Sequence, residues 1–251
     1  MLSSINKHER DDNITFDEEP HIYTVNGNSD NTSVTTLIHK QFEKFDADRI
    51  IKKMMSSSRW KTNKYYGKTR EEIKDEWKQN GIEAAKAGTK LHYDIECYYN
   101  NNPNINESIE YNHFLEFVND YKDLKPYRTE WMIWHEDLQL AGSIDMVFEN
   151  KDGTFEIYDW KRSKEIKKTA PWLRFSKTPC LEHIPDTNYW HYSLQLNTYK
   201  AILEEKYGKK VTNMYLVRLY PTESTYQRLK VIDLQSEVKD LFKLRMQELE
   251  N

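Results

Sequence analysis

The spacing of hydrophobic and polar residues changes half-way along the chain. Within 111–121 the hydrophobic side chains recur every three or four positions, as at Phe114 and Phe117, which is the period of an amphipathic helix. Beyond it come short runs rich in β-branched and aromatic residues, separated by polar turns. These runs lie at 128–135, 140–148 and 154–161. They predict an antiparallel three-stranded meander.

Turn residues and helix caps divide the rest of the chain. Ser33 and Asp46 are suited to begin helices, and Thr69 with Glu72 forms a capping-box pattern. The expected helices are 33–40, one from 46, 69–77, 82–99, 111–121, 192–207 and one from 234. Further strands are expected at 14–16, 21–25, 214–219 and 228–232. The polar residues 1–13 are predicted to be disordered, and 164–186 to form an irregular basic insertion.

The order of these elements predicts the fold class. From residue 82 it reads helix, three strands, helix, strand, which indicates an α/β (α+β) fold with a mixed central sheet flanked by helices. A mainly helical region precedes it. A chain of 251 residues can bury a sizeable core and suits a domain with a helical appendage. We expect an N-terminal hairpin and helical region at 1–80, a core at 81–233 and a C-terminal helix at 234–251.

Composition excludes some classes of protein. A net charge of −4 argues against a uniformly basic coat for nucleic acid, so any such contact must come from local patches. Cys97 and Cys180 lack CxxC spacing, which predicts reduced thiols and no disulfide framework or zinc site. Residues 1–12 lack the apolar stretch of a signal peptide, and no apolar run reaches the ~20 residues that span a bilayer. We expect a soluble, intracellular protein with no membrane partner.

The strand end at 159–161 carries the most informative chemistry. Side chains two apart on a strand point to the same face, so Asp159 and Lys161 place an acid beside a base. Asp145, on the preceding strand, would complete an oxygen-rich site for Mg²⁺ or Mn²⁺. Lys161 is then suited to orient or deprotonate a water molecule and to stabilise negative charge. An Asp-x-Lys pattern alone would more often be a surface ion pair.

Two predicted helices carry polar residues one turn apart. His92 and Glu96 share a helix face, and His92 would supply a nitrogen ligand that suits Mn²⁺ as well as Mg²⁺. Glu96 is a candidate catalytic residue that contacts the metal or its water; alternatively, it only orients its neighbours. Gln195 and Tyr199 are suited to hydrogen-bond the lysine, the attacking water or a phosphate. Each of these residues also has an ordinary interpretation as a polar group at the edge of the core.

Four short motifs in this order resemble those of PD-(D/E)xK nucleases of the RecB type, including the mitochondrial genome maintenance exonuclease and CRISPR-associated relatives. They are GxxxH at 88–92, GxxD at 142–145, DxK at 159–161 and QxxxY at 195–199. The segment 32–38 also resembles an SVT element found ahead of the core in mitochondrial and viral members, which suggests an origin in a large DNA virus. The proline of the family name is absent before Asp145, and so are the cysteines that hold an iron–sulfur cluster in some relatives.

This resemblance implies a restriction-endonuclease-like core and a metal-dependent deoxyribonuclease. The implied activity is that of an exonuclease leaving 5′-phosphate ends in DNA replication, repair or recombination, with Mg²⁺ or Mn²⁺ and without an iron–sulfur cluster. The implied roles are metal ligation by His92, Asp145 and Asp159, catalysis by Lys161, and completion of the site by Gln195 and Tyr199. A structure- or site-specific endonuclease and an inactive nucleic-acid-binding module remain open as alternatives.

Two basic segments are candidates for contact with DNA, either single-stranded or with free ends. The first contains Lys61, Lys64 and Tyr66, and a solvated helix face explains it equally well. The second follows directly on Lys161 and consists of Arg162, Lys164, Lys167, Lys168 and Arg174. Its position beside the predicted active site favours contact with DNA. Resemblance to the mitochondrial enzyme suggests that the N-terminal helices arch over a single strand; alternatively, they bind a replication or recombination protein.

Overall fold

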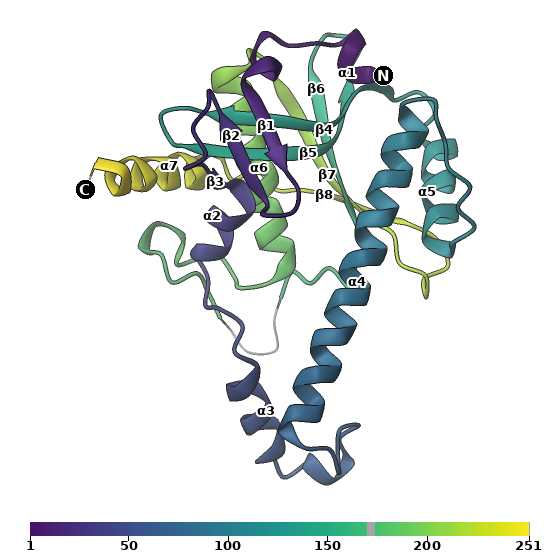
Figure 1. Cartoon of the computed structure of the whole chain (residues 1–251), viewed down its shortest axis with the longest axis vertical. Coiled ribbons are helices and arrows are strands. Elements are labelled where there is room, and N and C mark those ends of the chain that lie inside the picture. Colours follow the sequence, from purple (N-terminus) through teal and green to yellow (C-terminus); the bar gives the residue numbers. More distant parts are fainter. Residues whose placement is uncertain (170–173, 251) are drawn as a thin grey trace. The chain divides into compact units, whose positions relative to one another are not determined.

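The computed structural model describes residues 1–169 and 174–250. Figure 1 shows the order of the elements. The chain forms two compact units, one made of Met1–Glu43 and the chain from Leu91 onward, the other of Lys44–Lys90. The first 43 residues therefore pack with the later part of the sequence. As a division into domains, the boundaries after residues 80 and 233 stay a prediction.

The first unit is built on a mixed β-sheet. Its strands are β3 (Thr32–Ser33), β4 (Lys125–His135), β5 (Leu140–Glu149), β6 (Phe155–Lys161), β7 (Val211–Arg218) and β8 (Gln227–Lys230). Strands β4, β5 and β6 form the predicted antiparallel meander, and β7 lies parallel to β6. Strand β8 is antiparallel to β7, and β3 is parallel to β5. The predicted mixed sheet is confirmed.

Helices cover both faces of this sheet (Figure 1). Helix α6 (Asn188–Lys206) packs on one face with α2 (Val34–Lys40) and α7 (Gln235–Glu250), burying residues such as Leu194 and Ile202 against the strands. On the other face α5 (Ile109–Asp120) buries residues such as Phe114 and Phe117, together with Leu91 and Ile95 at the end of α4. Strand residues buried on both faces give the near-continuous apolar runs seen in the sequence.

The pairing of β5 leaves one short segment open. Strand β4 follows one edge of β5, whereas β3 pairs with Leu140 and Ala141 and β6 with Met146 to Glu149. Among the strands that the structure describes, none pairs with 142–145 on that second edge. This stretch is the GxxD motif, so its side chains and those at the end of β6 can meet where the two strands separate.

Residues 1–13 are ordered, and the prediction of disorder is wrong. The Arg128 guanidinium donates to Asp11 at 2.6 Å, and the Trp131 indole donates to the same carboxylate at 3.0 Å. Arg10 pairs with Glu136 at 2.7 Å. Charged residues that resembled a solvated tail instead hold this segment against β4. The segment contains α1 (Leu2–Ile5) and a 3-10 helix (Glu9–Asn13), and the antiparallel pair β1 (Ile14–Asp17) and β2 (Ile22–Val25) follows it.

The second unit consists of α3 (Ala47–Met55), a 3-10 helix (Trp60–Thr62) and the first part of α4 (Arg70–Tyr99). Its core contains Ile51, Tyr65 and Ile73. Helix α4 is continuous over 30 residues, so the predicted break before residue 82 is wrong. An internal glycine costs a helix only about 1 kcal/mol and need not end it. No helix within the described parts of the chain combines the length and apolarity needed to cross a bilayer.

Candidate active site

The end of β6 holds a buried ion pair. Lys161 Nζ lies 2.9 Å from Asp159 Oδ1 and 2.7 Å from Oδ2, and it also sits 4.5 Å from the centre of the Tyr192 ring. Burial raises the pKa of Asp159 to about 6; the Lys161 ammonium opposes this rise and the Asp145 carboxylate reinforces it. Burial alone would lower the pKa of Lys161, but the two carboxylates raise it. The lysine is therefore an ammonium ion at neutral pH.

The backbone of Trp160 links the other candidate residues. The last paired residues of β5 and β6 are Met146 and Tyr158, so the ladder has ended before Trp160. Its N–H donates to Asp145 Oδ2 at 2.9 Å, and its carbonyl lies 2.8 Å from His92 Nε2. Two side chains thus replace the missing strand partner and satisfy both buried backbone groups. The predicted convergence of His92 and Asp145 on the end of β6 is present.

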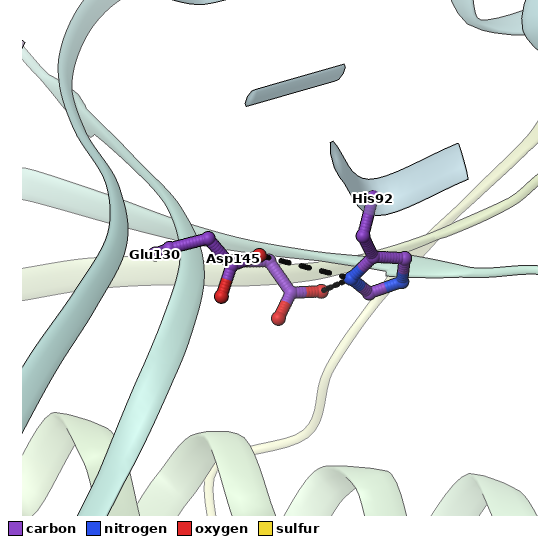
Figure 2. Close-up of side chains that lie close together, drawn as sticks. All are labelled: His92, Glu130 and Asp145. Carbon is purple, nitrogen blue, oxygen red and sulfur yellow. Dashed lines mark ion pairs between the residues drawn. The ribbon is translucent and has the colours of Figure 1, made fainter. Parts of the chain in front are cut away.

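His92 presents its other nitrogen to two carboxylates (Figure 2). Because Nε2 donates to a carbonyl, Nδ1 faces Asp145 Oδ2 at 3.5 Å and Glu130 Oε1 at 3.8 Å. Burial lowers the pKa of His92, but Asp145 and Glu130 outweigh it and raise the pKa to about 9. Without metal the ring therefore carries a proton on Nδ1. Loss of this proton exposes a lone pair directed at the carboxylates, which is the state a metal ligand requires.

Glu130 is the residue that the sequence interpretation missed. The pairs Thr129–Met146 and Trp131–Ile144 place Glu130 directly opposite Asp145 on adjacent strands. His92, Glu130 and Asp145 each offer one ligand atom, and these atoms all lie within 4.8 Å of one another. A signal was available, since the register of the predicted hairpin follows from the two strand ranges. Counting back from the turn would have paired residues 130 and 145.

Glu96 lies one turn beyond His92 on α4 and is half-buried. Burial raises the pKa of Glu96, and the negative charge of Glu130 raises it further. Both glutamates line a cavity of about 200 Å³, together with Asn100, Thr129 and residues of the N-terminal segment. Glu96 thus lines this cavity beside Glu130, and its catalytic role stays a prediction.

Gln195 and Tyr199 lie on α6, and the Tyr199 ring packs against β5. Gln195 Nε2 donates to the Tyr199 hydroxyl at 3.0 Å and to Thr35 Oγ1 at 3.3 Å. A Cβ atom added to Gly142 would lie only 2.8 Å from Tyr199 Cε1, so the glycine of the GxxD motif makes room for this ring. Burial is the main cause that raises the pKa of Tyr199. Direct participation of the pair in catalysis stays a prediction.

The basic residues after Lys161 differ in their surroundings. Arg162 Nε donates to Glu110 at 2.6 Å and is largely shielded. Lys164, Lys167, Lys168 and Arg174 have exposed side chains. Lys164 and Lys167 line an open pocket of about 400 Å³ with Thr187 and Asn188 at the start of α6.

The other basic segment lies in the second unit. Lys61, Lys64 and Tyr66 are exposed. The ammonium of Lys64 lies 4.5 Å from the centre of the Tyr65 ring, and the rings of Trp60 and Tyr66 are 5.9 Å apart. Aromatic and cationic side chains therefore share one small surface, and its contact with DNA stays a prediction.

Comparison with known proteins places the chain in a family. The family model described as the PD-(D/E)XK nuclease superfamily matches residues 27–250. The chain belongs to this superfamily. The PD-(D/E)XK assignment confirms the restriction-endonuclease-like fold, with its mixed sheet between helices, and identifies the protein as a nuclease, a hydrolase of phosphodiester bonds. Members of the superfamily use divalent metal ions, and the His92, Glu130 and Asp145 donors fit such an ion.

The remaining comparisons are less informative about this PD-(D/E)XK nuclease. Among solved structures, one titled "Crystal structure of SSO0001" is similar, with 14% identity, a TM-score of 0.37 and coverage of 89% of this chain and 78% of that chain. A similarity at this level carries no argument about function. No curated protein matches the chain. The RecB-type grouping and the viral origin stay predictions.

Proposed function

We propose that this nuclease is a Mg²⁺- or Mn²⁺-dependent DNA exonuclease that leaves 5′-phosphate ends. The observation that carries the proposal is the meeting of His92, Asp145 and the Asp159–Lys161 pair at the end of β6. These groups come from three segments that are distant in the sequence. A nitrogen ligand, hard oxygen ligands and a cation beside them suit hydrolysis of a phosphodiester.

His92, Asp145 and Asp159 are the residues proposed to hold the metal ion. When bound, a divalent ion neutralises the phosphate and lowers the pKa of a water molecule. The rest of the work falls to the protein. The Trp160 carbonyl fixes the His92 ring, and the Trp160 N–H fixes the Asp145 carboxylate, so both are positioned before substrate arrives.

Lys161 acts through its charge. Its pKa is raised by Asp159 and Asp145 against the effect of burial, which favours the ammonium over the free amine. An ammonium cannot take a proton from water, but it can donate hydrogen bonds to phosphate oxygens and stabilise the negative charge that develops on them. For Lys161, orientation of the water molecule and stabilisation of negative charge are therefore preferred over the role of a general base.

DNA is proposed to approach along the exposed residues that follow Lys161. Lys164, Lys167, Lys168 and Arg174 are exposed, and cationic side chains beside a phosphodiesterase site can neutralise backbone phosphates. Arg162 is placed to support this segment through Glu110. Lys61, Lys64 and Tyr66 form the second proposed contact, by charge and base stacking. A replication or recombination protein as a further partner and an intracellular location complete the proposal.

A substrate comparison tests this function. End-labelled linear single-stranded and double-stranded DNA and covalently closed circular DNA are incubated with Mg²⁺, with Mn²⁺ and with EDTA. Degradation of linear DNA alone, abolished by EDTA, is the expected result. Nicking of the closed circle would instead establish an endonuclease. Binding of DNA without any metal-dependent product would support an inactive binding module with the nuclease fold.

A further inference from the structure

We infer that Glu130 is a further protein ligand, beside His92, Asp145 and Asp159, of the divalent ion in the active site. This inference rests on the proposed metal-dependent function and extends it to a residue that lies outside all four sequence motifs. Figure 2 shows His92, Glu130 and Asp145 converging from one helix and two neighbouring strands.

The distances from His92 Nδ1 to the two carboxylates suit ligation of one ion. His92 Nδ1 lies 3.5 Å from Asp145 Oδ2 and 3.8 Å from Glu130 Oε1. Since metal–ligand distances are about 2.1 Å, two ligands of one ion lie at most about 4.2 Å apart. Both separations fall below that limit. The Nδ1 atom is also the free side of the ring, because Nε2 is committed to the Trp160 carbonyl.

The charges around Glu130 favour a bound cation. Glu130 and Asp145 face each other across an antiparallel pair of strands, and like charges in this position repel. The nearby ammonium of Lys161 is already within 2.7 Å of Asp159. A divalent ion bound between the two carboxylates would neutralise both of them.

The backbone of Glu130 is strained. Its φ is +41°, in the left-handed region that glutamate rarely adopts. Such backbone strain is retained mainly where function requires a particular side-chain direction. Ser143 Oγ donates to Glu130 Oε2 at 2.9 Å. With that oxygen fixed, Oε1 is the atom turned toward His92.

Metal binding to the full chain separates this role from a structural one. Mn²⁺ binding is measured by calorimetry for wild type, Glu130→Gln and Asp145→Asn, and thermal unfolding is followed with EDTA and with saturating Mn²⁺. We expect Glu130→Gln to weaken Mn²⁺ binding at least tenfold. In EDTA its Tm should equal or exceed that of wild type, because a repulsion is removed. The rise in Tm on adding Mn²⁺ should be smaller than in wild type.

Glu136→Gln is the matched control, because Glu136 lies on the same hairpin but pairs with Arg10. It should bind Mn²⁺ like wild type. If Asp145→Asn loses Mn²⁺ binding while Glu130→Gln retains it, the role of Glu130 is refuted and the proposed function stands. If neither variant alters Mn²⁺ binding, the metal centre itself is wrong.

A second variant covers the case in which Glu130→Gln fails to fold. Glu130→Asp keeps the charge and shortens the side chain by one methylene, which withdraws the carboxylate from His92 Nδ1. A ligand should then lose at least tenfold in Mn²⁺ affinity, whereas a purely electrostatic neighbour should lose little. Wild-type affinity in a folded Glu130→Asp protein would overturn the inference.

Discussion

Two carboxylate–cation pairs in the first unit, Asp159–Lys161 and Asp11–Arg128, differ in how well their carboxylates are satisfied. Asp11 accepts hydrogen bonds from the Arg128 guanidinium, the Trp131 indole and the His8 backbone at 2.6–3.0 Å. Although burial raises its pKa, these bonds outweigh burial and lower it.

Asp159 has its cation equally close, at 2.7 Å, but burial raises its pKa to about 6 and the neighbouring Asp145 adds to the rise. The contact distances of the two ion pairs are thus nearly the same, and the difference lies in the surroundings. Asp11 sits among donors, as expected of a pair that fastens the N-terminal segment. Asp159 sits beside another carboxylate, so an additional cation at this position would favour its charged form.

The largest effect is expected from variants that break the Asp159–Lys161 pair or remove the neighbouring Asp145 carboxylate. Asp159→Asn, Asp145→Asn and Lys161→Ala should each reduce cleavage of end-labelled DNA on the order of a thousandfold or more, because a ligand or a charge that stabilises the transition state is lost. Circular dichroism should show folded proteins. Asp152→Asn is the control, since this exposed carboxylate accepts hydrogen bonds from Thr154 in the turn before β6. Wild-type rates in all three variants would refute the site.

Breaking the other pair should affect stability and leave chemistry intact. Asp11→Asn is expected to lower the free energy of unfolding by about 2 kcal/mol, because Arg128 would keep a largely buried charge without its carboxylate. The rate per folded molecule should stay within about twofold of wild type. The neighbouring Asp12 provides the control, since its exposed pair with Lys7 should contribute almost nothing. Chemical denaturation and single-turnover cleavage measure the two quantities.

The two carboxylates should also give opposite dependences of stability on pH. The folded-state pKa of Asp159 is about 6, above its ordinary value of 3.8. Between these values the folded metal-free protein binds a proton that the unfolded chain has released, so stability increases as pH falls. The lowered pKa of Asp11 acts in the other direction. Its contribution is complete above its ordinary value of 3.8 and is lost as pH falls through the lower folded value.

Unfolding in EDTA between pH 3 and 7 tests this contrast. Relative to wild type, Asp159→Asn should gain on the order of 1 kcal/mol from pH 4 to pH 7, whereas Asp11→Asn should become relatively less stable as pH rises from 3 to 5. Parallel curves for the two variants would show that the surroundings of the carboxylates are alike.

The sequence could predict those candidate active-site residues that belong to local motifs. The meander, the mixed sheet and the approach of His92 and Asp145 to the end of β6 all followed from patterns within short segments. Glu130 lies outside these motifs. The register of the predicted hairpin would have paired it with Asp145, but no local pattern marks its left-handed backbone. The N-terminal segment was misread for a related reason. Polar composition suggested disorder, but its charges are paired with β4 residues more than 100 positions away.

The smallest effect is expected on DNA binding, from variants of the basic residues that follow Lys161. The charge of Arg162 is already matched by Glu110 at 2.6 Å, whereas Lys164 is exposed beside the open pocket at the start of α6. Lys164→Ala should weaken DNA binding a few-fold and reduce the slope of log K against log salt by about 0.7–0.9, the value for one phosphate contact.

Arg162→Ala should change that slope less, because a paired cation releases fewer counterions when DNA binds. Lys243→Ala, in which the lost ammonium pairs with Asp240 on α7, should leave both affinity and slope unchanged. The measurement is a fluorescence-anisotropy titration in EDTA, so that cleavage does not interfere. An unchanged slope for Lys164→Ala would remove this lysine from the DNA contact. A larger change in slope for Arg162→Ala than for Lys164→Ala would mean that a DNA phosphate replaces Glu110 as the partner of Arg162. The ion pairs of Arg162 and of Asp159 would then both exchange a protein partner for a ligand.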